Sequence, residues 1–570
     1  MQKLLRFLRP YRREVILGPC FKLLEAIFEL IVPVVMARII DGGIANGDAA
    51  YVGRMCGLIV LLGACGLCFA LTCQYLAARC AFGYGTDLRE ALYRHIHTLS
   101  AAELDRIGSA RLVSLLTNDV TASQSGVNMF IRLASRAPFL VIGAIVMSLI
   151  IDWQLSLIFL AVAPVIGWLL WFVMHRTIPL YGGNQKRLDR IAGRTQENLD
   201  GVRVIRAFSR QKQETQAFAD ACEDLEAAQL RVGRISAVLN PLTFMVLNLG
   251  IVAVLWFGGI HVDTGRLTQG DLTAFTNYMT QILLAMVALA NLIVILTRAQ
   301  ASSLRVAEVL AVTPSMEDGT GEPDPESPEA LCFDGVSFAY PGAADHALTD
   351  ISFTLHRGQT LGIIGGTGSG KSTLAALITR AYDPQQGTVR VFGADVRTLR
   401  LKALHRLIGC VPQKAVLMTG TVAENLRWAD PEASEEALGR AVRIAQAQEF
   451  VSGLPYGLRT HLVQGGRNLS GGQKQRLTIA RALAGHPAML ILDDSMSALD
   501  YATDAALRRA LREECAGMTT VVISQRATSL MHADHILVLE DGRCVGQGTH
   551  ETLLRDCGVY REIYQSQMRQ

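Results

Sequence analysis

Charged residues are scarce in this chain of 570 residues. Asp, Glu, Lys and Arg make up 18% of it, whereas soluble globular proteins carry about 25%. Hydrophobic residues make up 50%, a content that excludes a disordered chain. The lack of charge therefore indicates segments embedded in a membrane, and the length is enough for about two or three domains.

Neither sign of charge is in excess, because 54 Lys and Arg face 51 Asp and Glu. A nucleic-acid partner is not expected, since binding a phosphate backbone needs a surplus of basic residues. The 12 cysteines form no framework either. Cys65 and Cys68 make a CxxC inside an apolar run, but no second ligand pair lies nearby. We interpret them as small helical residues rather than a metal or redox site.

Six spans are predicted in the first 310 residues. Three apolar stretches contain no Asp, Glu, Lys or Arg and exceed the roughly 20 residues that a spanning helix needs; they are 55–78, 235–262 and 272–297. The stretch 137–174 is long enough for two spans, with a tight turn at Asp152. The first span, from Val15 to about Met36, is interrupted by charges.

Basic residues predict the orientation of these spans. Five of them precede the first span: Lys3, Arg6, Arg9, Arg12 and Arg13. Basic flanks favour the cytoplasmic side, so both termini are expected there when the number of spans is even. The Arg-rich segments 79–128 and 175–234 are then cytoplasmic, and their helical periodicity indicates that the spans continue as helices below the membrane. The chain is predicted to be a multi-pass protein of the cell membrane.

The composition changes at 313–330, which is rich in proline, glycine and acids. We interpret this segment as a linker between a transmembrane domain at 1–312 and a second domain at 331–570. In the second domain strand-like runs alternate with helical stretches, which is typical of an α/β fold. The clearest strand-like runs are 360–364, 489–492, 520–524 and 535–539.

A phosphate-binding motif, GxxxxGK followed by Ser, comes directly after the first of these strands and before a predicted helix at Thr373–Tyr382. Its glycines let backbone N–H groups converge on phosphate oxygens. Lys371 reaches the terminal phosphates, and Ser372 can ligate Mg²⁺. The predicted site comprises Gly365, Gly366, Thr367, Gly368, Ser369, Gly370, Lys371, Ser372 and Thr373. We therefore predict a bound nucleoside triphosphate.

Asp493 ends the apolar strand at 489–492. It is placed to hold Mg²⁺ through water, as a Walker B aspartate does. A surface acid at a strand end is the alternative, and the phosphate motif makes that alternative weaker.

Between the two motifs lies a third, LSGGQ, formed by Leu469, Ser470, Gly471, Gly472 and Gln473. With it the sequence resembles the ATP-binding cassette (ABC) transporters over nearly its whole length. It looks like an exporter-type half-transporter. The resemblance implies an all-α six-helix transmembrane domain followed by an α/β P-loop NTPase, with ATP and Mg²⁺ as ligands.

The same resemblance implies roles for single residues. Tyr340 would stack on adenine, Gln413 would contact Mg²⁺ and the γ-phosphate, and Asp500 would belong to the D-loop. The segments 104–117 and 202–210 resemble the regions that couple the cassette to the spans.

Two positions depart from the family pattern. Asp494 stands where the family has its catalytic glutamate, and Gln525 stands where it has its switch histidine. The aspartate is one methylene shorter, and general-base catalysis depends first on reach. Glutamine can donate a hydrogen bond, but it cannot carry a proton or a positive charge. Conservative variation with retained activity is the alternative, but the two changes together predict a site that binds ATP and hydrolyses it poorly.

In this family each ATP is sandwiched between the Walker motifs of one subunit and the LSGGQ of the other. The residues that act on the chain's own ATP depart from the family pattern here. LSGGQ and Asp500, which act in trans on the partner's ATP, do not. The resemblance therefore predicts a heterodimer of the multidrug-exporter type, whose partner supplies the consensus glutamate and histidine.

The substrate is less determined by the sequence. Lys22, Glu25 and Glu29 share one face of the first span, where charges are costly and often line a water-filled path. An acidic lining for cationic or amphipathic compounds is one interpretation, and an internal Lys22–Glu25 pair is the other. Asn277 and Gln281 in the last span either line the same cavity or bond between helices.

Three other functions stay open from the sequence: a slow homodimeric exporter of lipids or drugs, an importer on an exporter-like scaffold, and a regulatory subunit in which bound ATP is a persistent latch.

Overall fold

The computed structural model describes residues 2–568, which divide into two compact units. Unit 1 holds the chain up to His97 together with Ala110–Val312 and is all helical. Unit 2 holds Thr98–Ser109 together with the chain from Thr313 onward and is a mixed α/β domain. The predicted fold class, a helical transmembrane domain followed by an α/β P-loop domain, is confirmed.

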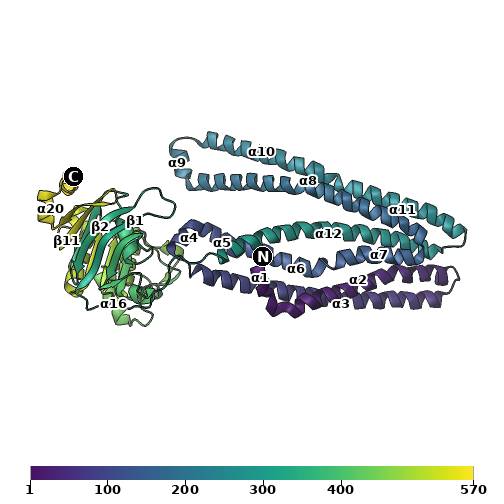
Figure 1. Ribbon diagram of the computed structural model, residues 1–570, viewed down its shortest axis with the longest axis horizontal. Coiled ribbons are helices and arrows are strands. Elements are labelled where there is room, and N and C mark those ends of the chain that lie inside the picture. The colour runs from purple at the N-terminus through teal and green to yellow at the C-terminus, as the bar shows by residue number, and fades with distance from the viewer. Residues whose placement is uncertain (1, 569–570) are drawn as a thin grey trace. The chain divides into compact units, whose positions relative to one another are not determined.

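Unit 1 is a set of long helices joined by short turns (Figure 1). The helices are α1 (Gln2–Leu5), η1 (Arg6–Tyr11), α2 (Arg12–Arg38), η2 (Ile39–Ile44), α3 (Ala49–Ile96), α5 (Ser109–Ser114), η3 (Leu115–Asp119), α6 (Val120–Leu133), α7 (Arg136–Ile151), α8 (Trp153–Asp200), α9 (Val202–Ala207), α10 (Gln211–Ala237), α11 (Leu239–Asp263) and α12 (Gln269–Leu310).

Five helical stretches of the described chain are long and apolar enough to cross a membrane: Ala49–Ile96, Ser109–Ile151, Trp153–Asp200, Gln211–Asp263 and Gln269–Leu310. The 27-residue α2 is a further long helix and carries the three charges noted in the sequence. The predicted tight turn lies at Asp152, whose Oδ1 accepts a hydrogen bond from Leu155 N and so caps α8. At 48 residues, α8 is about 72 Å long, more than twice a hydrocarbon core of about 30 Å, so it must continue outside the membrane.

The core of unit 1 is built from large side chains and close helix contacts. Phe159 of α8 lies edge-on to Phe275 of α12, with ring centroids 5.6 Å apart, and both are fully buried. A Cβ at Gly143 would lie 2.3 Å from Leu30 Cδ1, so glycine here lets the Leu30 side chain of α2 pack directly against α7. Figure 1 also shows α8 and α10 running side by side.

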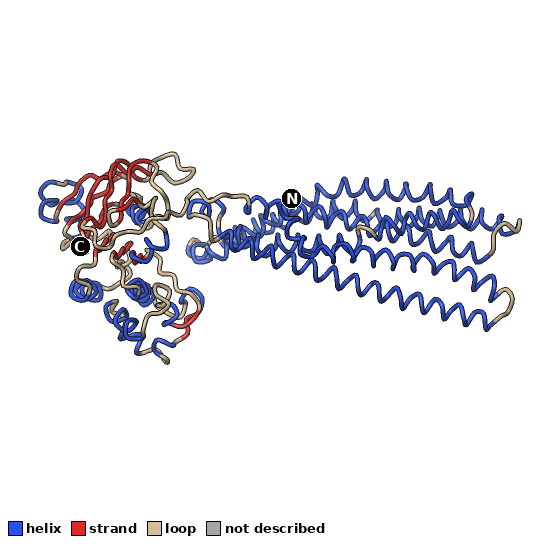
Figure 2. Tube along the Cα trace, turned by 60° about the horizontal axis from the view of Figure 1, so that its bottom comes forward, coloured by secondary structure: helices blue, strands red, loops and turns tan. Residues whose placement is uncertain are grey.

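Unit 2 contains a six-stranded sheet in the order β12-β11-β3-β10-β9-β6 and a four-stranded antiparallel sheet in the order β2-β1-β4-β5 (Figure 2). In the larger sheet only the edge strand β12 is antiparallel to its neighbour. The strands are β1 (Glu329–Phe338), β2 (Leu348–His356), β3 (Thr360–Gly365), β4 (Gln386–Val391), β5 (Ala394–Asp395), β6 (Ile408–Val411), β7 (Gly420–Thr421), β8 (His461–Leu462), β9 (Met489–Asp493), β10 (Thr519–Ile523), β11 (His535–Glu540) and β12 (Arg543–Gly548).

The helices of unit 2 are mostly short. They are α4 (Ala101–Ile107), α13 (Lys371–Ile378), α14 (Leu401–Leu407), α15 (Val422–Leu426), α16 (Glu435–Ile444), α17 (Gln448–Ser452), η4 (Gly457–Arg459), η5 (Gln464–Gly466), α18 (Gly471–Ala484), α19 (Tyr501–Glu514), η6 (Ala527–Ser529), α20 (His550–Asp556) and α21 (Gly558–Met568).

The four predicted strands are confirmed within about one residue at each end, as β3, β9, β10 and β11. They read as continuous apolar runs because a parallel sheet is buried on both faces. The helix predicted at Thr373–Tyr382 is wrong at its ends, because α13 begins at Lys371 and stops at Ile378. It stops there because Arg380 takes a left-handed backbone conformation, with φ of 50°, which a helix cannot continue through.

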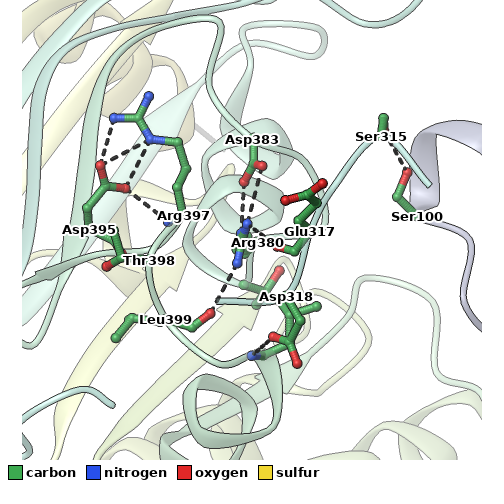
Figure 3. A network of polar contacts seen from close by, with 12 residues as sticks. Ser100, Ser315, Glu317, Asp318, Arg380, Asp383, Asp395, Arg397, Thr398 and Leu399 are labelled. Atoms are coloured by element: carbon green, nitrogen blue, oxygen red, sulfur yellow. Dashed lines mark hydrogen bonds and ion pairs between the residues drawn. The ribbon is translucent and has the colours of Figure 1, made fainter. Parts of the chain in front are cut away.

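Arg380 ties the polar segment after Thr313 to unit 2 (Figure 3). Its buried guanidinium donates to the backbone oxygens of Glu317 and Leu399 and to the carboxylate of Asp383. The carboxylate of Asp318 accepts a hydrogen bond from Leu401 N at 2.7 Å. This segment is therefore held along the surface of unit 2 by specific bonds before β1 begins.

Candidate nucleotide-binding site

Three neighbouring parallel strands bring most of the predicted cis residues to one edge of the large sheet. The phosphate-binding loop follows β3, Asp493 and Asp494 lie at the end of β9, and Gln525 follows β10. Carboxyl ends of parallel strands meet at one edge, where ligands of such sheets bind. A cavity of about 320 Å³ opens there, lined by Tyr340, Ala347, Thr367, Gly368, Gly370, Lys371, Ser372, Thr373, Gln413, Asp493, Asp494, Ile523 and Gln525.

The loop is shaped by its glycines. Gly368 and Gly370 have φ of 84° and 94°, a region that residues with a side chain rarely adopt. A Cβ at Gly365 would lie 2.2 Å from the carbonyl oxygen of Leu539. Because α13 begins at Lys371, the loop also presents the N-terminus of a helix to the cavity, which favours an anion.

Lys371 is buried and folds back over the loop. Its Nζ donates to the carbonyl oxygens of Gly366 and Gly365 at 2.5 and 3.0 Å. Burial lowers the pKa of this lysine, and the nearby Asp494 and Asp493 act in the opposite direction. Phosphate oxygens entering the cavity would replace these loop acceptors of the Lys371 ammonium group.

Ser372 and Asp493 together offer the oxygen ligands that Mg²⁺ requires. The hydroxyl of Ser372 donates to Asp493 Oδ1 at 3.1 Å, so the two oxygens lie next to each other in the lining of the cavity. Burial raises the pKa of Asp493, and the carboxylate of Asp494 raises it further. A bound cation would stabilise the ionised form of Asp493 against both effects. Within the described chain no cluster of three or more His, Cys, Asp or Glu could hold a metal alone. Mg²⁺ is commonly held by one or two protein ligands together with substrate phosphate oxygens, so Ser372 and Asp493 fit it.

The two departing residues lie next to each other. The carboxylate of Asp494 accepts from the side-chain amide of Gln413 at 3.4 Å and from that of Gln525 at 3.5 Å. Burial raises the pKa of Asp494, while the bond from Gln413 and the charges of Lys371 and Arg526 oppose the rise. The aspartate is therefore held between two amides at the mouth of the phosphate loop.

An aromatic cluster forms the other wall. Tyr340 lies edge-on to Phe338 and to Tyr382, with centroids 5.1 and 5.4 Å apart. Its hydroxyl is 3.1 Å from that of Thr373, so its ring lies beside the start of α13. The hydroxyl of Tyr382 donates to the carboxylate of Asp105 in α4, which lies within the predicted coupling segment 104–117.

The sequence analysis missed several of these residues. Ala347 and Ile523 line the cavity but carry no motif, since apolar residues give no chemical signal. Tyr382 and Asp105 are 277 positions apart, so only the fold brings them together.

The predicted trans residues form a separate surface, and none of Leu469–Gln473 or Asp500 lines the cavity. Ser470 caps α18, because its hydroxyl accepts from Gln473 N while the side chain of Gln473 accepts from Ser470 N. Asp500 caps α19 through Thr503. Ser470, Gly471 and Asp500 are exposed, so the N-termini of both helices are free to meet a second molecule.

In unit 1 the predicted substrate residues are mostly engaged in internal bonds. Glu25 pairs with Lys22 at 2.6 Å, and Glu29 pairs with Arg136 of α7 at 2.7 Å. The side chain of Gln281 donates to the backbone oxygen of Glu29, a bond between α12 and α2. That of Asn277 donates to Thr273 O in its own helix.

Comparison with known proteins agrees with both units. Residues 15–286 match the family pattern described as ABC transporter transmembrane region, and residues 348–497 match the one described as ABC transporter. An uncharacterized ABC transporter ATP-binding protein of Mycobacterium tuberculosis is 39% identical, and the match covers 98% of this chain and 97% of that protein.

A multidrug efflux ATP-binding/permease protein of the same species is 35% identical over 97% of this chain but only 46% of its own length. A solved structure of a bacterial Atm1-family ABC exporter with ATP bound has the same fold, with a TM-score of 0.81, 24% identity and 98% of both chains covered.

Proposed function

The chain belongs to the ABC transporter family, and on that premise we propose that it is one half of an ATP-driven exporter that pairs with a different half-transporter. The multidrug efflux relative is about twice as long, so this chain corresponds to one of its two halves. A chain of this kind needs a second half to complete its ATP sites.

The observation that carries the proposal is the contrast between the two sets of nucleotide residues. In the cavity, Asp494 and Gln525 replace the residues that activate water and contact the γ-phosphate in the family. On the separate surface, LSGGQ and Asp500 keep the family's residues, and Ser470, Gly471 and Asp500 are exposed. An intact trans surface beside an altered cis site is what a subunit needs if hydrolysis takes place in its partner.

Within its own cavity the chain binds and orients the nucleotide. Tyr340 provides a flat face for the adenine, the loop amides and Lys371 hold the phosphates, and Ser372 with Asp493 would hold Mg²⁺ with Gln413 close by. Bound Mg²⁺ would neutralise charge that develops on the transferred phosphoryl group.

The step at which this chain falls short is water activation. A general base must lie within hydrogen-bond distance of the proton that it removes. The carboxylate of Asp494 ends one methylene earlier than that of glutamate and is held back toward Gln413 and Gln525. Gln525 can donate to a phosphate oxygen, but it cannot supply positive charge.

This chain also supplies one side of the site that binds the partner's ATP. At the exposed N-terminus of α18, the first backbone N–H groups and the positive end of the helix dipole can interact with an anion on the partner. A γ-phosphate held by the partner's Walker motifs fits that surface. Closure of the two cassettes on ATP would then drive the spans through the segments 104–117 and 202–210.

We assign amphipathic compounds as the substrates, moved outward across the cell membrane, with both termini in the cytoplasm. The multidrug efflux relative supports the substrate class, and the basic flanks of the first span support the orientation.

A slow homodimeric exporter is the second candidate, and one observation favours it. Asp494 is still a carboxylate beside Lys371, so some capacity to accept a proton remains at this site. The chain alone would then hydrolyse ATP at a low rate.

Vanadate trapping separates the two candidates. The chain is co-expressed with a half-transporter that carries the consensus glutamate and histidine, and the pair is incubated with Mg²⁺, vanadate and a photoreactive ATP. The heterodimer predicts that vanadate-dependent label lies on the partner and that label on this chain is independent of vanadate. Vanadate-dependent label on this chain would favour the homodimer.

A further inference from the structure

A group of five charged side chains lies on three helices of unit 1. Lys22, Glu25 and Glu29 are on α2, Arg132 is the penultimate residue of α6, and Arg136 begins α7. Charged groups at membrane depth are costly and mark sites of function more often than the same groups in water.

The cluster lies toward the inner leaflet. Sixteen residues of α7 separate Arg136 from the turn at Asp152, which is about 24 Å of helix. On the proposed orientation that turn faces outward, and the hydrocarbon core is about 30 Å thick. The guanidinium groups therefore lie within reach of the inner headgroup region but inside the helical bundle.

The cations outnumber the anions. Lys22 pairs with Glu25, and Arg136 donates from Nη2 to Glu29, so both carboxylates are neutralised. In the described chain Arg132 has no ion-pair partner. Helix α6, which carries Arg132, packs against both α2 and α3. Three cations and two anions leave one positive charge uncompensated.

Buried polar atoms at the same place lack partners. They are Arg132 Nε, Ser135 Oγ, Arg136 Nε and Gln281 Oε1. Three of the four can donate, and their residues are spaced at i, i+3 and i+4, which brings them to one side of the chain. A buried donor without an acceptor is unfavourable, and more so when it is charged.

A proline follows these groups closely in the chain. Pro138 has no N–H to bond the oxygen of Ala134, so the helical hydrogen bonding is interrupted between α6 and α7, although Ala134 and Ser135 keep helical backbone angles. An anion at this point would meet the guanidinium donors and the hydroxyl of Ser135 together.

We propose that Arg132, Ser135 and Arg136 form an anion-binding site for the carboxylate or phosphate head of an amphipathic substrate. This inference rests on the proposed function, since it names the charge of the exported compound. It replaces the acidic lining suggested by α2 with a basic one, because Glu25 and Glu29 already have cationic partners.

Equilibrium binding tests this site directly. The full chain is placed in nanodiscs of phosphatidylcholine and titrated with 11-(dansylamino)undecanoate, its methyl ester, and a dansyl-labelled undecyltrimethylammonium, with empty discs subtracted. The carboxylate is expected to bind at least about ten-fold more tightly than the ester. Arg132→Gln should weaken carboxylate binding about ten-fold and leave ester binding unchanged.

A second variant guards against loss of folding. Glu29→Gln frees Arg136 from its pair, so it should tighten carboxylate binding about three-fold, a gain that misfolding cannot produce. Arg38→Gln is the matched control, because Arg38 is an exposed arginine of the same helix as Glu29 and should change nothing. Preference for the cationic probe, or unchanged carboxylate binding in both Arg132→Gln and Glu29→Gln, would overturn the proposal.

Two further arms complete the design. Adding phosphatidylglycerol to the discs distinguishes the two sources of the anionic head. Competition with the probe assigns the site to a lipid headgroup, and no competition assigns it to a free amphiphile. Both outcomes agree with the proposal. The binding needs no ATP. Charge selectivity without ATPase would therefore contradict only the exporter function, and ATPase without charge selectivity would contradict only this site.

Discussion

At the scale of single residues, Asp494 combines two properties that set the activity of this cassette. Its backbone has φ of 45°, a left-handed conformation that aspartate and asparagine tolerate better than most residues. Its carboxylate lies between the amides of Gln413 and Gln525. A short side chain therefore fits the turn, and in the proposed function it holds the base away from the γ-phosphate.

Restoring the family residues should restore hydrolysis. Asp494→Glu combined with Gln525→His is expected to raise the ATPase rate of the chain alone about ten-fold or more, because a positioned general base contributes about 10²–10⁴. Phosphate release in nanodiscs measures this. Asp494→Asn, which is isosteric but cannot accept the proton, is the control, and an unchanged rate in the double variant would contradict the role given to these two positions.

The residual activity should also depend on pH in a specific direction. Burial raises the pKa of Asp494, so the ionised base is lost as the pH falls through a value above the ordinary 3.8. The bond from Gln413 opposes that rise. Gln413→Ala should therefore move the acidic limb of the kcat profile to higher pH. A limb that stays in place, while nucleotide binding is intact, would show that Asp494 is not the titrating group.

At the scale of elements, helix α4 contacts the aromatic cluster beside the cavity. Asp105 of α4 accepts from Tyr382, which lies edge-on to Tyr340. This contact joins the segment 104–117, which resembles a coupling region, to the residue proposed to stack on adenine.

Removing the hydroxyl of Tyr382 should loosen that connection without emptying the cavity. Tyr382→Phe keeps the ring contact with Tyr340 but breaks the bond to Asp105, at a cost of about 1 kcal/mol in stability. We expect unchanged ATP affinity and a reduced stimulation of ATPase by transported compounds. Tyr456→Phe, at an exposed tyrosine of the same unit, is the control. Full stimulation in Tyr382→Phe would contradict a coupling role.

Helix α18 carries the prediction about the partner. Ser470→Arg removes the N-cap and places a bulky cation at the exposed helix end. We expect the ATPase of the heterodimer to fall at least about ten-fold, while this chain's own cavity still binds a fluorescent ATP analogue. Unaffected turnover would mean that LSGGQ does not complete the partner's site.

At the scale of the whole molecule, the chain divides its chemistry between two surfaces. The cavity at the edge of the large sheet contains the phosphate loop, and the exposed N-termini of α18 and α19 lie outside its lining. Such a division makes sense only in an assembly of two halves. The altered residues are confined to the first surface, and this is why we favour a partner that differs from this chain.

The sequence predicted the strands and the phosphate loop well, because buried parallel strands read as apolar runs and the loop depends on consecutive residues. Pairings across the fold were not accessible to it. The i, i+3 spacing in the sequence indicated Lys22 as an ion-pair partner of Glu25, but the partner of Glu29 lies 107 positions away on α7. The membership of α4 in unit 2 depends likewise on contacts such as Asp105 with Tyr382. These interactions follow from packing, which local patterns do not encode.

The most direct test of the account is steady-state ATPase of the purified chain, first alone and then together with a half-transporter that carries the consensus glutamate and histidine. The account predicts negligible activity alone and robust activity for the pair, which would be nearly abolished when the partner's catalytic glutamate is changed to glutamine and only modestly lowered by Asp494→Ala. Robust activity of the chain alone would contradict it, because Asp494 and Gln525 would then suffice for hydrolysis.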